Sequence, residues 1–267
     1  MEYKMKLWVG LGLAASLATS GMVQANGTKH IDHGNILLAE ASGEGGEGGG
    51  EAGTDAGAEG PDDAAYLVSL SLMEGHMRVG TELYGMGEAD MAKTHMKHPR
   101  DEIYTALEPA LLARKAPDFA GALDAVGQTV NAGGDAAEAK QRFQDFEKAI
   151  HAARPQALEA ATAAKAVVQL IRTAAEEYAI GIKDGKIDNL HEYQDAWGFT
   201  QVAAQILASL SDEERAEHKN EIAGLEAEIA GLAGLWPDLA GKKPVTTTAK
   251  ALFVAAAKME LLALEIN

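Results

Sequence analysis

One stretch of the sequence concentrates side chains that bind metal ions. Residues 72–99 read LMEGHMRVGTELYGMGEADMAKTHMKHP and contain five of the nine methionines and three of the eight histidines. Imidazole with thioether sulfur suits copper, whereas imidazole with carboxylate suits iron or zinc, and this stretch offers both sets of ligands. It therefore predicts either a metal site or a methionine-rich core with a few polar neighbours.

The first half of this stretch has the spacing of an α-helix with one apolar face. The stripe along that face consists of Tyr66, Leu70, Met73, Met77, Gly80 and Tyr84. His76 lies at the edge of the stripe, and Gly80 would allow a neighbouring helix to approach closely. Met73 and Met77 are candidate ligands on one interpretation, and on the other they fill gaps in the core, as methionine commonly does.

The second half predicts another helix whose candidate ligands share one face. They follow each other at i, i+3, i+7 and i+10 and are Glu88, Met91, His95 and His98. The Gly85-Met86-Gly87 break allows the chain to reverse, so we expect His76 to approach His95 and His98. Met91 or Glu88 would complete a site for copper or iron. The alternative is a solvated helix with surface histidines, whose last turn is distorted because Pro99 disfavours helical backbone at His98.

A second group of candidate ligands lies in residues 176–199, EEYAIGIKDGKIDNLHEYQDAWGF. The Asp184-Gly185 turn joins two antiparallel helices, so Glu177 is expected to face the segment 191–195 across the hairpin. The candidate ligands here are Glu177, Asp184, His191, Glu192 and Asp195. Carboxylates with a histidine suit iron. The alternative is an ordinary polar hairpin end with surface ion pairs.

The elements that must position these residues are all helical. Apolar residues recur every three or four positions from Asp62 onward, and strand-like runs are absent. We expect helices near 62–84, 88–98, 100–114, 117–131, 135–152, 155–184, 188–209, 211–234 and 246–265. The sequence thus predicts an all-α, multi-helix bundle of about eight to nine helices. We divide it into an N-terminal region, 62–152, with the Met/His cluster, and a C-terminal region, 153–267.

The N-terminal part of the chain indicates export. Lys4 and Lys6 precede an apolar stretch that ends at Val23-Gln24-Ala25, as in a secretory signal peptide over residues 1–25. Residues 26–61 are rich in Gly and acid and predict a disordered linker, in which the HIDH segment at 30–33 is a weak candidate metal site. The chain has no cysteine and a net charge of −17, which disfavours nucleic acid as a partner. We therefore expect a periplasmic, soluble protein that does not span the membrane.

One segment resembles a known family. Residues 167–199 read VVQLIRTAAEEYAIGIKDGKIDNLHEYQDAWGF, with acid–Tyr pairs at 177–178 and 192–193, Asp184-Gly185 between them, and Phe199. In this order they are similar to the extracytoplasmic helical domain of bacterial high-affinity iron permeases, over about residues 155–235. The permeases also carry Arg-Glu-x-x-Glu motifs in membrane helices, which this sequence lacks. The resemblance therefore implies a soluble, exported relative that works beside a metal-uptake system and is not itself the channel.

Two functions are compatible with these patterns. The first is a metal-binding protein for iron (or copper) acquisition or handling, with an inner-membrane metal permease or a periplasmic redox partner. The second is a metal-free helical scaffold that docks on a membrane transport complex. No nucleophile elbow, P-loop or dinucleotide motif is present, and Gly75-His76 does not fit the Gly-x-His-x-x-Glu motif of imelysin-type proteins. We expect no enzymatic activity, and we expect His151 and His218 to be surface residues.

Overall fold

The computed structural model describes residues 62–266. The predicted signal peptide, the linker and the HIDH segment lie outside this range, and within it the side chain of His98 is not among the described features. The described residues belong to one compact unit. Among them, no helix combines the length and the apolar character that crossing a bilayer would require.

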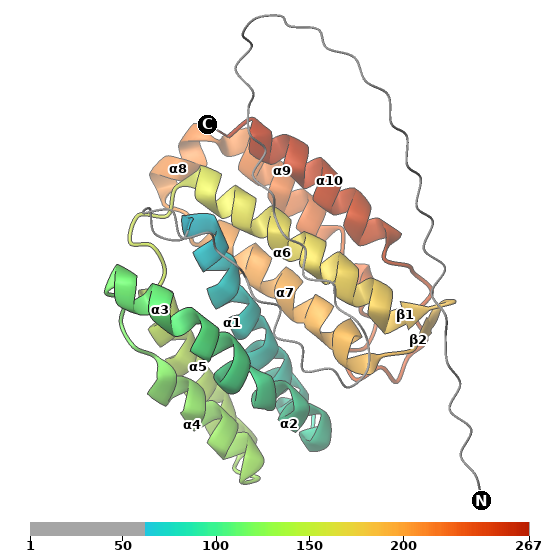
Figure 1. The fold of residues 1–267 in the computed structure, drawn as a ribbon. Helices are drawn as coiled ribbons and strands as arrows, with labels where there is room; N and C mark the ends of the chain where they lie inside the picture. The colour runs from blue at the N-terminus through green and yellow to red at the C-terminus, as the bar shows by residue number, and fades with distance from the viewer. Residues whose placement is uncertain (1–61, 267) are drawn as a thin grey trace, which may run out of the picture. The chain divides into compact units, whose positions relative to one another are not determined.

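Most of the described residues are helical and very few are in strands, which confirms the predicted all-α bundle (Figure 1). The N-terminal helices are α1 (Asp63–Gly85), α2 (Ala89–His98), α3 (Thr105–Arg114), α4 (Ala120–Asn131) and α5 (Ala136–Ala152). The C-terminal helices are α6 (Ala160–Gly181), α7 (Leu190–Ala208), α8 (Asp212–Glu217), α9 (Lys219–Ala230) and α10 (Lys250–Leu264). A 3-10 turn, η2 (Ala233–Leu235), follows α9.

The structure differs from the predicted helices at three places. A π-helical turn, η1 (Pro99–Tyr104), joins α2 to α3, because proline lacks the N–H that the α-helical ladder needs. The helix expected over 155–184 ends at Gly181, and the antiparallel strands β1 (Ile182–Lys183) and β2 (Lys186–Ile187) form a small hairpin before α7. The helix expected over 211–234 is broken at His218, where the backbone leaves the helical conformation.

Two hydrophobic clusters hold these helices together, and α1 contributes to both. Helices α6, α7, α9 and α10 form the C-terminal cluster, which Leu67 of α1 also joins. The N-terminal cluster contains Leu70, Met73 and Met77 of α1 with residues of α2 to α5. In Figure 1, α1 accordingly lies between the α6–α7 pair and the N-terminal helices. Side chains that α1 and α7 direct toward each other therefore meet where the two clusters adjoin.

Glycines allow close helix crossings beside the candidate ligands. A Cβ added at Gly198 of α7 would lie 2.6 Å from the backbone oxygen of Gly75 in α1, next to His76. A Cβ added at Gly80 would lie 3.1 Å from the oxygen of Ala92 in α2, which confirms the close approach expected at Gly80. These crossings place α1 against both α2 and α7.

The Gly198 crossing leads to a stability prediction. Gly198→Ala should lower the free energy of unfolding by about 1–3 kcal/mol, because a methyl group inserted into a packed contact displaces its neighbours. Urea unfolding followed by circular dichroism measures the change. Gly121→Ala is the control, since an added Cβ on this exposed residue of α4 meets nothing within 4 Å. The control should be neutral or stabilising, and equal effects of both substitutions would contradict the packing argument.

Candidate metal centre

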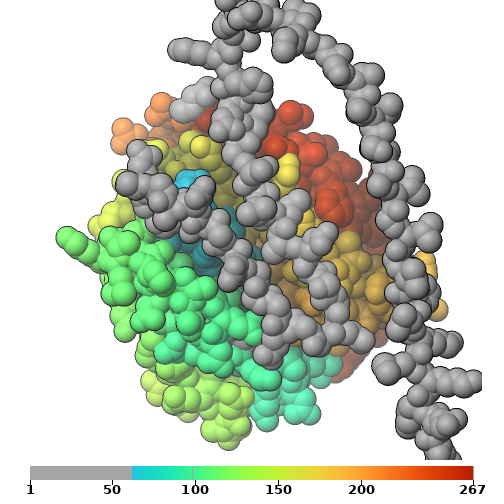
Figure 2. All heavy atoms as spheres, viewed as in Figure 1, coloured from blue at the N-terminus to red at the C-terminus, as the bar shows by residue number. Residues whose placement is uncertain are grey.

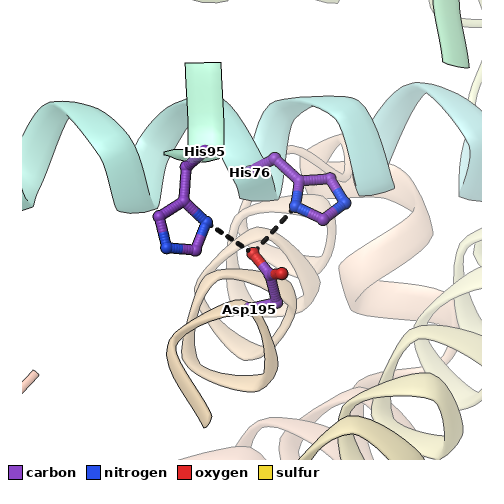
Figure 3. A group of neighbouring side chains, drawn as sticks. All are labelled: His76, His95 and Asp195. Atoms are coloured by element: carbon purple, nitrogen blue, oxygen red, sulfur yellow. Dashed lines mark hydrogen bonds and ion pairs between the residues drawn. The ribbon is translucent and has the colours of Figure 1, made fainter. Parts of the chain in front are cut away.

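Helices α1 and α2 each direct a histidine at one buried carboxylate on α7. The Nδ1 atom of His76 on α1 lies 2.8 Å from Oδ1 of Asp195 on α7. The Nδ1 atom of His95 on α2 lies 3.0 Å from the same oxygen. Figure 3 shows both histidines pointing at this one oxygen, while the second oxygen of Asp195 receives neither of them. His95 and Asp195 are each only 1% exposed.

A third histidine contacts the other oxygen of the same carboxylate. Nδ1 of His191, one turn before Asp195 on α7, lies 3.0 Å from Oδ2 of Asp195 and 3.9 Å from Oε2 of Glu192. The rings of His191 and His95 stack with their centroids 4.2 Å apart and their planes 4° from parallel. The two imidazole rings therefore lie face to face, and each directs its Nδ1 atom at a different oxygen of Asp195.

A carboxyl pair extends the cluster toward α6. The side chain of Glu177 on α6 forms a hydrogen bond with that of Glu192, as the hairpin geometry predicted. Burial and then the contact with Glu192 raise the pKa of Glu177, so Glu177 holds a proton at neutral pH. A Cβ added at Gly181 would lie 2.7 Å from the backbone nitrogen of Tyr193, so α6 and α7 approach closely beside this pair.

The metal-free cluster contains a buried ion pair. Burial by itself would raise the pKa of Asp195, but the charge of His76 and hydrogen bonds from the three histidines hold it well below its usual range. Burial would lower the pKa of His191, but its hydrogen bonds to Asp195 and Glu192 outweigh burial and raise that pKa to about 10. The carboxylate of Asp195 is thus ionised, and the protonated ring of His191 balances its charge.

Gln194 fixes the orientation of His95. Its Nε2 atom donates to the backbone oxygen of Leu239 at 3.1 Å and contacts the sulfur of Met91 at 3.6 Å. Its Oε1 atom therefore faces Nε2 of His95, at 2.9 Å, and accepts a hydrogen bond from it. Proteins use this arrangement around metal ligands to direct the free ring nitrogen to the ion. Sequence reasoning missed Gln194, because nothing in its spacing distinguishes it from a surface glutamine.

The structure joins the two predicted sites into one. His76 and His95 come from the first candidate group, and His191, Glu192 and Asp195 come from the second, with Glu177 next to them. The predicted approach of His76 to His95 is confirmed, since both bind Asp195. The sulfur of Met91 contacts Gln194, which binds His95.

The other predicted ligands lie elsewhere. Met73 and Met77 are fully buried in the N-terminal hydrophobic cluster, which is the core interpretation of the apolar stripe. Glu88 precedes α2 in non-helical backbone and forms an ion pair with Lys242, so it leaves the face on which regular spacing placed it. Asp184 is exposed in the β1–β2 turn with a φ of 52°.

The tyrosines of the two acid–Tyr pairs serve the core. The hydroxyl of Tyr178 donates to the backbone oxygen of Leu235 at 3.0 Å, and that of Tyr193 donates to the oxygen of Asp238 at 3.1 Å. Both rings pack against Trp236. The acids of these pairs thus face the candidate centre while the phenols stabilise the bundle behind it.

A separate buried charge network lies beside the centre. Glu74 is fully buried on α1, and its Oε2 atom accepts from Arg154 at 2.7 Å and lies 3.1 Å from Nε2 of His151. Arg78 binds the other oxygen of Glu74 at 3.3 Å and also pairs with Glu147 of α5. His151, which was expected at the surface, has a side chain that is 36% exposed and also contacts the buried Glu74. The i, i+4 spacing of Glu74 and Arg78 was the available signal for part of this network.

The C-terminal helices define a four-helix bundle, in which α6, α7, α9 and α10 pack around one core. Residues 153–261 match the family model of the iron permease-associated 4-helix bundle domain, which confirms the resemblance seen in the sequence. The comparisons with curated proteins and with solved structures found no match. The matched range includes Glu177, His191, Glu192 and Asp195, whereas His76 and His95 precede it. The N-terminal region thus supplies part of the centre.

Proposed function

We propose that this protein is an exported, periplasmic iron-binding protein that works beside an inner-membrane iron permease. The cluster of His76, His95, His191, Glu192 and Asp195 is its binding site. The match of residues 153–261 to an iron permease-associated domain supports both the metal and the partner. The role that we propose is to bind and deliver the metal, without catalysis.

One observation carries this proposal. Because Nε2 of His95 donates to Gln194, its Nδ1 atom meets Oδ1 of Asp195 at 3.0 Å either as an N–H donor, as in the metal-free cluster, or, in a neutral ring, with a lone pair. Two acceptors at that distance repel unless a proton or a cation lies between them. His76 reaches the same oxygen at 2.8 Å. Ligands of one metal ion at about 2.1 Å from it are themselves about 3 Å apart, so these separations suit a shared ion.

The donor set favours iron over copper. Two imidazoles and one carboxylate, as in His76, His95 and Asp195, are the ligands of many non-haem Fe(II) centres. The additional carboxylates of Glu192 and Glu177 are also hard ligands. The copper interpretation depended on thioether ligands, and Met73 and Met77 lie in the core instead.

One side of the cluster is partly exposed to solvent. The side chains of His76 and His191 are 19% and 31% exposed, whereas that of His95 is buried. The cluster therefore has a solvent-exposed side formed by His76 and His191 and a buried side formed by His95 and Gln194. Such a site combines an entry path with ligands held rigidly.

Metal binding should stabilise the folded protein. Fe(II) added anaerobically at about one hundred times its Kd should contribute about 2.7 kcal/mol, which raises Tm by about 5–11 °C in a domain of this size. Thermal unfolding followed by circular dichroism, with and without Fe(II), measures the shift. The double variant His76→Ala/His95→Ala should lose it.

His218, which is half-buried, supplies the control for this experiment. His218→Ala should keep the full Fe(II)-dependent rise in Tm, because His218 lies between α8 and α9, outside the cluster. A wild-type Tm that Fe(II) does not move, or a shift that survives the His76→Ala/His95→Ala change, would rule out iron binding at this site.

The scaffold function has one observation in its favour. Helix α10 lies at the surface, where it is seen in red (Figure 2), and carries exposed apolar side chains. These are Phe253, Val254, Leu261 and Leu264, the last two being 66% and 69% exposed. A scaffold that docks on a permease through α10 would bind it equally well with and without Fe(II). The metal-delivery role proposed above instead requires that Fe(II) change the affinity of the protein for the permease.

A further inference from the structure

The two oxygens of Asp195 belong to two different ligand groups. Oδ1 faces His76 and His95, at 2.8 and 3.0 Å, and Oδ2 faces His191, at 3.0 Å. The first group is His76, His95 and Asp195, and the second is His191, Glu192 and Asp195. Within each group the potential ligand atoms lie within 4.8 Å of one another. Asp195 is the member that both groups share.

The stacked rings keep the two groups apart. His95 and His191 lie in nearly parallel planes with centroids 4.2 Å apart, so their Nδ1 atoms are directed at neighbouring oxygens and not at one point. The two oxygens of a carboxylate can bind two metal ions, which is the usual bridge in carboxylate-rich helical bundles. Two rings stacked as His95 and His191 are can each supply an imidazole to a different metal ion.

A further carboxyl group, from another helix, lies next to the second group. Glu177 of α6 forms a hydrogen bond with Glu192 of α7, and both side chains are largely removed from solvent. A proton joins these two carboxyl groups in the metal-free protein, and a bound cation can take the place of that proton. The second group thus contains an imidazole and three carboxyl groups, counting the shared Asp195, whereas the first contains two imidazoles and Asp195.

We propose that the centre holds two transition-metal ions bridged by Asp195. His76 and His95 bind the first ion through Oδ1, and His191, Glu192 and Glu177 bind the second through Oδ2. This inference rests on the proposed function, because it concerns the same residues, but it adds a second ion and assigns ligands to each.

The test is the number of ions bound. The metal-free full-length protein is dialysed anaerobically against Fe(II), and the bound iron is measured by inductively coupled plasma mass spectrometry. Wild type should bind two equivalents. Glu177→Gln/Glu192→Gln should bind one, because it neutralises the second group and leaves His76, His95 and Asp195 intact. Glu176→Gln, next to Glu177 on the same helix, is the matched control and should bind two. Circular dichroism verifies that each variant is folded, and Glu192→Gln alone replaces the double variant if that does not fold.

The outcomes separate this inference from the proposed function. One equivalent in wild type would overturn the bridge and leave the proposed function standing, whereas none would overturn both. Two equivalents in both wild type and the double variant would place the second ion elsewhere and overturn the assignment.

Cu(II) as a probe adds a spectroscopic test. Two ions bridged by Asp195 should interact magnetically, so the second equivalent should reduce the electron paramagnetic resonance signal per copper. Two independent, additive signals would contradict the bridge.

Discussion

Asp195→Asn should weaken Fe(II) binding by at least about 100-fold. Loss of a residue that merely orients a ligand typically costs 10–100-fold in metal affinity. In the proposed site Asp195 is itself a ligand, and it contacts three histidines. The substitution keeps the size of the side chain but removes its charge and replaces one oxygen by an amide group. Anaerobic isothermal titration calorimetry of wild type and variant measures the loss.

Asp184→Asn is the matched control for this prediction. Asp184 lies in the same hairpin region and was a candidate ligand from the sequence, but it is exposed in the turn between β1 and β2. Its replacement should leave the Kd unchanged. If Asp195→Asn bound Fe(II) as wild type does, while its circular dichroism spectrum showed a folded protein, Asp195 would not be a ligand.

Glu74→Gln should lower the free energy of unfolding at neutral pH by about 3–5 kcal/mol. Removing one partner from a buried ion pair leaves the other charge without compensation, which is the source of this cost. Here Arg154 is the buried partner, at 2.7 Å from Glu74, and it is 8% exposed. Glu138→Gln, which removes an exposed i, i+4 pair with Arg142, should change the free energy by less than about 0.5 kcal/mol.

The effect of Glu74→Gln should depend on pH. Burial by itself raises the pKa of Glu74, but the hydrogen bond from His151 and the charge of Arg154 outweigh it, so the net shift is downward. A depressed pKa contributes stability that is fully present above the unfolded value, about 4.3, and is lost as pH falls through the folded value. The difference between wild type and variant should therefore stay constant from pH 7 to about 5 and shrink below about 4.3. Urea unfolding over this range tests the sign, and a difference that grows in acid would contradict it.

The sequence predicted the helices and part of the centre because both depend on local spacing. The period of α1 and the glycine-containing break after it placed His76 near His95, and the Asp-Gly turn placed Glu177 near Glu192. The sequence could not show that these two groups form one cluster. His76 and Asp195 are separated by 119 positions, and only the packing of α1 on α7 brings them together.

Physical reasons also explain why some candidate ligands lie away from the cluster. Periodicity tells which residues share a face of a helix, but not whether an apolar core or a polar cluster covers that face, so it could not decide the role of Met73 and Met77. Glu88 has φ −90° and ψ 60°, and its side chain therefore does not follow the helical face that contains His95. Gln194 was missed because its role depends on the backbone of Leu239, which reaches it from another part of the chain.

A crystal structure of the iron-loaded protein, with anomalous scattering measured at the iron absorption edge, tests the central claim most directly. We expect an anomalous peak within about 2.0–2.3 Å of the ligand atoms of His76, His95 and Asp195. Anomalous peaks confined to exposed carboxylates, with His76 and His95 still in direct contact with Asp195, would contradict it.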